Sequence, residues 1–349
     1  MHYPTIPPID KQAAKQAQAR QNRLTKPPGS LGRLEEISIQ LAGMKAYPMP
    51  EVSRKAVIVM AADHGVALEG VSAFPVEVTK QMVLNFLHGG AAINVLARQA
   101  GAATHIVDIG VASDFDPSLP GLWRRKIAHG TRNMAKEPAM TRVQAEQALA
   151  CGMEVLAEIA EKGLDVIATG DMGIGNTTSS AAIVAVMAGL PVDKVTGRGT
   201  GLDDAGLLRK IQVIQQAIAV NQPDPNDPMD VLCKVGGLEI AGLAGVMIAA
   251  AARRIPVAVD GFISTAAAMI GVGLVPDVRH YLFGAHRSVE IGHQVMHKHL
   301  GLTPLLNLNL RLGEGTGAVL AFHLLEAACR LLREMATFDE AGVSDKRKG

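Results

Sequence analysis

The sequence is poor in cysteine and in aromatic residues. Among 349 residues, cysteine occurs only as Cys151, Cys233 and Cys329, and Phe, Trp and Tyr together make up 3%. The cysteines are far apart and form no Cys-x-x-Cys pair, which excludes a disulfide framework and a thiolate zinc site. Three scattered thiols fit a reducing, cytoplasmic location. Because β-sandwich strands favour aromatic side chains, few aromatics beside 36 glycines favour an α/β enzyme.

The chain also lacks an excess of charge and a long hydrophobic run. Lys and Arg number 34 and Asp and Glu 33, a net charge of +1. This balance argues against nucleic acid as the main partner, because phosphate backbones attract a basic surface. The longest strongly apolar stretches, residues 181–192 and 240–252, are shorter than the roughly 18 residues of a membrane span. Residues 1–8 have neither the basic nor the apolar part of a secretory leader.

Short apolar runs alternate with helical patterns along most of the chain. The runs are residues 56–60, 105–109, 166–169, 257–259 and 281–283, and each leads into a polar loop that contains glycine. The helical patterns between them are residues 76–87, 91–99, 141–161, 179–187, 204–220 and 238–253. Apolar strands alternating with helices predict an α/β fold with a parallel sheet flanked by helices, Rossmann-like in organisation. Ligands of such sheets bind beyond the carboxyl ends of the strands.

The two ends of the chain have a different pattern. Residues 9–45 contain two helical segments, and a very apolar helix spans residues 316–335. We expect these helices to pack together. The predicted organisation is a large α/β catalytic domain, residues 51–309, and a small helical domain built from residues 1–50 together with 310–349.

A glycine-rich segment, residues 169–178, lies between a predicted strand and a predicted helix. Amide groups at a helix N-terminus bind phosphate well, with support from the helix dipole. The segment is not a Walker A loop, because Asn176 stands where lysine should follow glycine. It could equally be a tight turn, with Asn176 or a threonine as helix cap.

A second glycine-rich segment, residues 196–204, ends in Asp203 and Asp204, one of which is expected to cap the next helix. Lys210, in the second turn of that helix, could reach an anion, although a lone lysine more often lies on a solvated face. An apolar strand should precede the acidic loop of diphosphate-dependent phosphoribosyltransferases. Glycine precedes the two aspartates here, so we reject that match.

Glu314 stands between two glycines, just before a buried helix. It could be a sterically open general base or simply complement the helix dipole. His293 and His297 have the spacing of helical metal ligands, with Glu290 one turn earlier. No carboxylate lies between the histidines as in His-Glu-x-x-His, so we favour histidines that lie on the helix surface or are hydrogen-bonded, and we predict no metal.

Taken together, these segments resemble the nicotinate-nucleotide–dimethylbenzimidazole phosphoribosyltransferase family over nearly the whole chain. The joint order of the motifs carries the resemblance. They are TKPPGSLGRL (25–34), ADHGV (62–66), GVSAFP (70–75), TKQM (79–82), GGAAIN (89–94), GDMGIGNTT (170–178), GRGTG (197–201), VDGF (259–262), HRS (286–288) and LRLGEGTG (310–317).

The resemblance implies a reaction and an assembly. Nicotinate mononucleotide gives its 5-phosphoribosyl group to 5,6-dimethylbenzimidazole, with inversion at ribose C1′, to form α-ribazole 5′-phosphate and nicotinate. The substrates are small molecules, no cofactor or metal is implied, and the expected state is a homodimer.

The resemblance also implies roles for individual residues. Glu314 matches the general base, and Asp171 stands where the family has glutamate, close to the reacting ribose. The benzimidazole pocket is expected at Ser72, Phe74 and Gln81, flanked by Met172, Leu312 and Gly313. The phosphate site is expected at Gly173, Gly175, Asn176, Thr177, Lys210 and Ser288, and the ribose or nicotinate near Asp260 and Gly261. Phe74 replaces an expected tyrosine and so lacks its hydroxyl.

Two other functions remain open from the residues themselves. A nucleotide-binding regulator could keep the fold and the phosphate loops without turnover, although the presence of Glu314 argues against this. A nucleoside-cleaving enzyme could use water or another base as acceptor. Related acceptor bases are also expected, because one methylene in an apolar pocket discriminates by only about 1–3 kcal/mol.

Overall fold

The centre of the molecule is a parallel sheet. The computed structural model describes residues 1–199 and 201–344, and these contain a six-stranded sheet in the order β3-β2-β1-β4-β5-β6. All neighbouring strands are parallel. The strands are β1 (Lys55–Ala62), β2 (Ala102–Gly110), β3 (Leu122–Arg124), β4 (Val166–Met172), β5 (Val257–Val259) and β6 (Leu282–Gly284). The predicted parallel α/β fold is confirmed.

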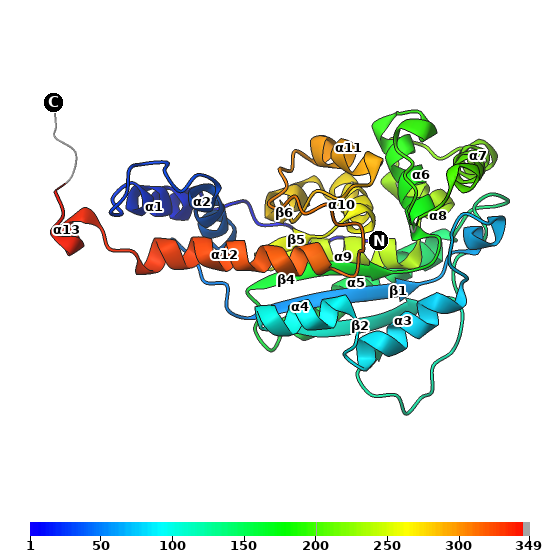
Figure 1. The fold of residues 1–349 in the computed structure, drawn as a ribbon, viewed down its shortest axis with the longest axis horizontal. Coiled ribbons are helices and arrows are strands. Elements are labelled where there is room, and N and C mark those ends of the chain that lie inside the picture. The colour runs from blue at the N-terminus through cyan, green and yellow to red at the C-terminus, as the bar shows by residue number, and fades with distance from the viewer. Residues whose placement is uncertain (200, 345–349) are drawn as a thin grey trace.

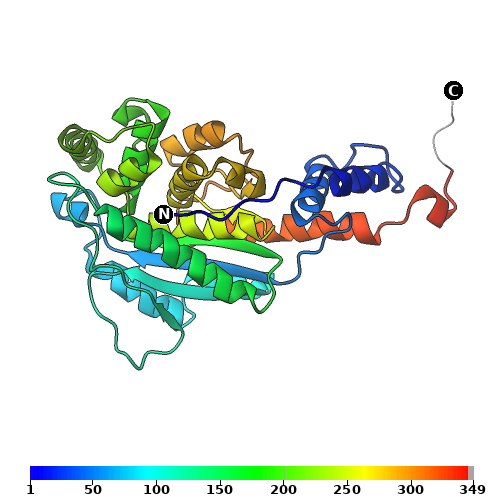
Figure 2. The same cartoon turned by 180° about the vertical axis from the view of Figure 1, so that it is seen from behind.

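Helices cover both faces of this sheet. In Figure 1, α3 (Glu77–Leu87), α4 (Ala92–Ala100) and α12 (Thr316–Glu334) lie in front of it. Figure 2 shows α5 (Arg142–Ala160) and α9 (Leu238–Ala252) on the opposite face. The other helices are α1 (Lys11–Gln21), α2 (Arg33–Lys45), α6 (Asn176–Ala188), α7 (Asp204–Asn221), α8 (Pro228–Val235), α10 (Phe262–Leu274), α11 (Ile291–Leu300) and α13 (Phe338–Ala341). With both faces covered, β1 and β4 are almost entirely buried, which explains their unbroken apolar runs.

The strand order fixes where a ligand can bind. From β1 the chain moves outward to β2 and β3, then returns to β4 on the other side and continues to β5 and β6. Adjacent connections therefore diverge between β1 and β4, and a crevice forms at their carboxyl ends. The segment after β4 is the glycine-rich one, so the sequence signal and the topology point to the same place.

Two predicted boundaries near this crevice were wrong. The strand predicted to end at Thr169 continues through Met172, because Gly170 and Asp171 still pair with β1 at Val59 and Met60. Asp171 therefore lies on a strand and not in the following loop. The helix predicted from residue 179 begins at Asn176, one residue after Gly175 makes the turn with a φ of 98°.

The helices from the two chain ends pack together, as expected. Figure 1 shows α1 and α2 beside the C-terminal half of α12, to one side of the sheet. Ala17, Ala42 and Leu332 form a separate small core between them. The first half of α12 lies on the sheet, however, and residues 1–9 run back to the α/β part, where the Tyr281 hydroxyl donates to the Pro7 carbonyl (2.8 Å).

The division into domains at residues 50 and 310 stays a prediction. Thr200, in the second glycine-rich segment, and residues 345–349, at the end of the predicted small domain, lie outside the described residues. Within the described part of the chain, no helix has the length and apolar character needed to cross a membrane.

Candidate active site

A cavity of about 300 Å³ opens at the carboxyl ends of the strands. Its walls come from α3, the end of β4, the start of α6 and the loops that follow β5 and β6. The last wall is the loop before α12. Of the residues predicted for the site, those in the lining are Phe74, Asp171, Met172, Gly173, Asn176, Thr177, Gly261, Ser288, Leu312, Gly313 and Glu314. The fold thus brings together segments that are up to 240 residues apart in sequence.

Five predicted residues lie outside this lining. Gly175 and Lys210 lie directly behind it: Gly175 turns the chain into α6, and the Lys210 ammonium contacts Thr177. Asp260 is fully buried behind the loop that carries Glu314. The Ser72 hydroxyl accepts a hydrogen bond from the Phe74 amide (3.2 Å), and the Gln81 side chain is exposed. The roles proposed for Ser72 and Gln81 stay predictions.

Other residues of the lining were not singled out from the sequence. Its apolar part includes Val78, Met82, Ile174, Phe262 and Ile263, and its polar part includes Gly199, His286, Glu290 and Arg311. The spacing of Val78 and Met82, four residues apart on α3, could have placed both beside Phe74. No such signal marked Glu290, because the sequence pattern indicated it only as a weak candidate for a metal ligand.

Glu314 occupies a strained turn. Its φ is 64°, and its neighbours Gly313 and Gly315 have φ of 81° and 88°. A left-handed conformation costs a residue other than glycine about 1–2 kcal/mol. The missing side chain of Gly170 makes room for the Glu314 carbonyl against β4, since a Cβ there would lie 2.6 Å from the carbonyl carbon. The turn therefore depends on three glycines: Gly313 and Gly315, which flank Glu314, and Gly170 of β4, which packs against it.

The Glu314 carboxylate is 4% exposed and faces the first turn of α4, where Oε2 accepts a long hydrogen bond from the Ile93 amide (3.4 Å). Burial raises the pKa of Glu314, the Ile93 bond opposes this, and the negative charge of Asp260 raises the pKa further. A carboxylate with a raised pKa is a better proton acceptor than an ordinary one at neutral pH. The geometry suits a general base open to the cavity.

Asp171 is a second buried carboxylate in the same lining. Its Oδ2 accepts a hydrogen bond from the Asn176 side-chain amide (3.0 Å), and its Oδ1 has no partner among the residues that the structure describes. Burial raises the pKa of Asp171 well above its usual range, and the charges of Asp260 and Glu239 raise it further. An unpartnered acceptor or donor at a cavity wall is suited to a ligand hydroxyl.

The start of α6 and Lys210 form a site suited to an anion. The residue at the N-cap of α6 is Gly175, so the predicted cap at Asn176 or a threonine was wrong, and the Asn176 side-chain amide donates to Asp171 instead. Lys210 is 1% exposed, not solvated, and its Nζ donates to Thr177 Oγ1 (2.8 Å). Burial lowers its pKa to about 8, although the nearby Glu290 charge opposes the shift. Asp203 caps α7, as predicted, by accepting from the Gly206 amide.

The two histidines of α11 differ: His293 is engaged in hydrogen bonds, whereas the buried His297 Nε2 has no hydrogen-bond partner among the described residues. His293 Nδ1 accepts from the Ser288 amide (2.8 Å), and its Nε2 lies 2.9 Å from Thr265 Oγ1. Burial lowers the pKa of His293 well below its usual range and that of His297 to about 4. The hydrogen-bonded alternative for His293 is therefore confirmed. Among the residues that the structure describes, no three His, Cys, Asp or Glu side chains are grouped as metal ligands would be.

Comparisons with known proteins agree with this geometry. A family model described as phosphoribosyltransferase matches residues 6–343. A nicotinate-nucleotide–dimethylbenzimidazole phosphoribosyltransferase from a Roseiflexus species is 60% identical over 341 residues, which cover 98% of this chain and 96% of that protein. One from Geobacter sulfurreducens is 56% identical over 340 residues, which cover 97% and 96%.

Solved structures extend the agreement to the fold. The crystal structure of CobT from Thermus thermophilus matches with a TM-score of 0.92 and 48% identity, covering 96% of this chain and 100% of that one. The resemblance stated from the motifs is thereby confirmed. The chain belongs to the nicotinate-nucleotide–dimethylbenzimidazole phosphoribosyltransferase family.

Proposed function

We propose that the protein transfers the 5-phosphoribosyl group of nicotinate mononucleotide to 5,6-dimethylbenzimidazole, in the nucleotide-loop branch of cobalamin biosynthesis. The products are α-ribazole 5′-phosphate and nicotinate. The observation that carries the proposal is one cavity that combines a buried carboxylate on a strained turn, an apolar wall and an anion site at a helix start. As a phosphoribosyltransferase, the protein acts on small molecules.

The chemistry needs one proton acceptor and no acid. Nicotinate leaves from C1′ as a neutral ring nitrogen, so nothing has to protonate it. The attacking benzimidazole nitrogen gains positive charge, which makes the N–H of the other ring nitrogen acidic, and Glu314 accepts that proton. General-base catalysis contributes about 10²–10⁴-fold, and holding two substrates in line contributes about 7 kcal/mol or more. Attack opposite the leaving group inverts C1′.

The lining supports a proposed place in the cavity for each part of the substrates. Phe74, Met172 and Leu312 offer an apolar surface to the benzimidazole, with Gly313 beside it. The phosphate binds at the start of α6. The Lys210 ammonium contributes a positive charge there, and its hydrogen bond to Thr177 places it beside the first turn of the helix. The other residues proposed for the phosphate end of the cavity are Gly173, Gly175, Asn176 and Ser288. Asp171 and Gly261 face the ribose or nicotinate, and Asp171 binds a ribose hydroxyl with its unpartnered oxygen.

We also propose that the enzyme is a homodimer in the cytoplasm. The family resemblance supports the homodimer. Three cysteines, of which Cys151 and Cys329 are buried and none is in a disulfide among the described residues, support a reducing compartment.

The decisive experiment is a product assay. Purified protein is mixed with nicotinate mononucleotide, with and without dimethylbenzimidazole, and the products are separated chromatographically. We expect nicotinate and α-ribazole phosphate only when both substrates are present. Release of nicotinate without the acceptor would identify a hydrolase. Nucleotide binding without any product would favour the regulator.

A further inference from the structure

The carboxylate of Asp260 connects the sheet to the turn that carries Glu314. Asp260 directly follows β5 and is fully buried. Its Oδ2 accepts a hydrogen bond from the Gly315 amide (3.1 Å), and its Oδ1 accepts one from the Ala318 amide (2.9 Å). Gly315 immediately follows Glu314, and Ala318 lies in the first turn of α12. One side chain thus caps α12 from a distant strand and holds the residue next to the proposed base.

The turn needs such a support because its conformation is unfavourable by itself. A residue other than glycine keeps a left-handed conformation only where its surroundings enforce it. Within the segment, the Thr316 amide and hydroxyl both donate to the Gly313 carbonyl (3.1 and 2.9 Å). These bonds fix the shape of the turn but not its place. Asp260 ties the turn to the sheet through its bonds to Gly315 and Ala318.

The loop that follows β6 encloses Asp260 from the other side. The His286 Nε2 lies 3.5 Å from Asp260 Oδ1, and both side chains are at most 2% exposed. The imidazole packs against Gly317, where a side chain would collide with the ring. The carboxylate is therefore enclosed between the imidazole and the start of α12.

We propose that Asp260 is a positioning residue of the transfer reaction, which holds Glu314 in place by fixing the turn at residues 313–315 to the sheet. The proposal rests on the proposed role of Glu314 as the base. It gives Asp260 a different part from the ribose or nicotinate contact predicted from the sequence.

The charged groups around Glu314 make the pH dependence of kcat a useful measurement, because a variant that only lowers stability would leave that dependence unchanged. Asp260 and Asp171 contribute negative charge from β5 and β4, and the Ile93 amide of α4 donates to the carboxylate. His286 faces Asp260, and the Arg311 guanidinium on the same loop donates to the Gly199 carbonyl. Because the Asp260 charge raises the pKa of Glu314, its removal lowers that pKa.

The test compares Asp260→Asn and Asp260→Glu with Glu314→Gln. The asparagine keeps the size but presents an amide to one of the two backbone donors. We expect kcat to fall about 10²-fold, the cost of a misplaced catalytic group, with KM for nicotinate mononucleotide nearly unchanged. The acid limb of the kcat profile should move to lower pH. Asp260→Glu keeps the charge, so its limb should match the unchanged protein, with part of the kcat restored.

Asp227→Asn is the matched control. Asp227 caps α8 by accepting from the Met229 and Asp230 amides (3.0 and 3.2 Å), and it does not line the cavity. Its loss should lower stability without moving the pH profile.

An unchanged kcat and acid limb in Asp260→Asn would overturn the proposal, as would a large rise in KM with kcat retained, which would mark a substrate contact. Should neither variant fold, amide exchange in the unchanged protein decides: Gly315 and Ala318 should exchange slowly, and fast exchange at both overturns the proposal. Normal turnover in Glu314→Gln would instead overturn the role of Glu314 as the base, whereas absence of the transfer products in the unchanged protein would overturn the proposed function. An inactive Glu314→Gln beside a normal Asp260→Asn would reject only the role of Asp260.

Discussion

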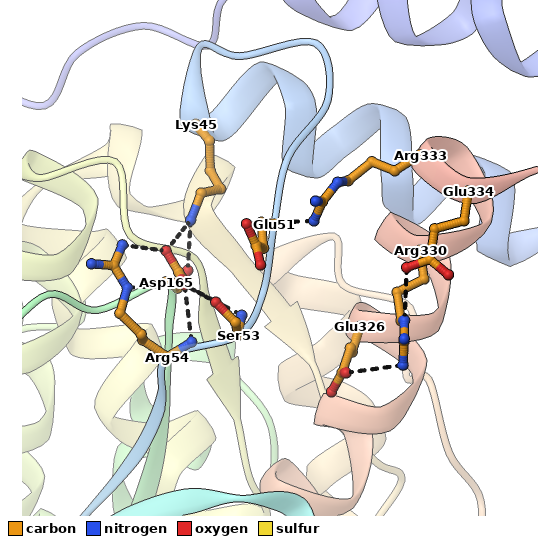
Figure 3. A network of polar contacts seen from close by, with 9 residues as sticks. All are labelled: Lys45, Glu51, Ser53, Arg54, Asp165, Glu326, Arg330, Arg333 and Glu334. Atoms are coloured by element: carbon orange, nitrogen blue, oxygen red, sulfur yellow. Dashed lines mark hydrogen bonds and ion pairs between the residues drawn. The ribbon is translucent and has the colours of Figure 1, made fainter.

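Two aspartates at opposite ends of β4 have opposite electrostatic surroundings. Asp165 directly precedes the strand, and Asp171 lies near its end. Figure 3 shows Lys45, Ser53 and Arg54 converging on the Asp165 carboxylate. Burial raises the pKa of Asp165, but these hydrogen bonds and charges outweigh it and hold the pKa well below the usual range. Within the described part of the chain, Asp171 has one hydrogen-bond partner, and its pKa lies well above that range.

The difference separates stability from function along one strand. At the amino end, the partners of Asp165 satisfy both of its oxygens, and Lys45 brings α2 to the sheet. At the carboxyl end, Asp171 and Glu314 lie buried with few partners, which costs stability and leaves them available to a ligand. The comparison predicts that changes at one end alter the free energy of unfolding and changes at the other alter turnover.

The largest effect is expected at Glu314. Glu314→Gln removes the proton acceptor while keeping the size of the side chain, so kcat should fall about 10²–10⁴-fold. Binding of nicotinate mononucleotide, measured by calorimetry, should be nearly unchanged. The control is Glu334→Gln, at the exposed far end of α12. Near-normal turnover in Glu314→Gln would remove Glu314 from the role of base.

Asp165→Asn should give the largest loss of stability. The variant breaks the contacts with Lys45 and Arg54, and we expect the free energy of unfolding to fall by about 2 kcal/mol, with specific activity retained. The folded-state pKa is depressed, so this contribution is present above the unfolded pKa of about 4 and is lost as the pH falls through the folded pKa. Denaturant unfolding at several pH values measures it. Equal stability of both proteins at neutral pH would contradict the comparison.

Lys210→Met should raise KM for nicotinate mononucleotide about 10- to 100-fold and leave KM for the base nearly unchanged, because a charged hydrogen bond to phosphate is lost. Since the pKa of Lys210 is about 8, KM of the unchanged enzyme should rise as the pH increases through that value, and that of the variant should not. Lys298→Met, an exposed lysine of α11, is the control. Equal losses for both substrates would argue against a phosphate contact.

Asp171→Asn should produce the smallest change in stability, with the opposite sign to Asp165→Asn. The folded-state pKa is raised, so stability is lost as the pH rises from the unfolded pKa through the folded one. Asparagine carries no charge to bury, and the variant should gain about 1 kcal/mol toward pH 8, with a smaller gain toward pH 5. Unfolding curves at both pH values test this. A variant that is less stable at high pH would show that the Asp171 charge is compensated.

The strands of the sheet could be predicted from the sequence more accurately than the contacts of the polar side chains. The buried run of β5 was predicted with its observed bounds, Val257–Val259, because three β-branched or small apolar residues lie between polar loops. The edge strand β3 was missed because it is three residues long and includes Arg124. Glu314 was singled out because its flanking glycines are visible locally, but its role as general base was predicted only from the family resemblance.

Contacts between segments that are distant in the chain could not be predicted from local sequence patterns. The burial of Lys210 depends on Thr177, 33 residues away, and local patterning indicated a solvated lysine as readily. Asp165 was not singled out, because its partners Lys45 and Arg54 lie more than 110 residues away. A pKa shift follows from such neighbours and from burial, which no short motif records.

Helix α12 connects the turn that carries the proposed base to the helices of the N-terminal segment. It has 19 residues, about 28 Å at ~1.5 Å per residue, with the proposed base at one end and the α1–α2 packing at the other. A tilt of about 2° about the far end displaces the near end by about 1 Å, a displacement large enough to cost about 10²-fold in rate. The packing of α1 and α2 on the far end of α12 therefore acts together with the contacts of its near end to the sheet in keeping the proposed base in place.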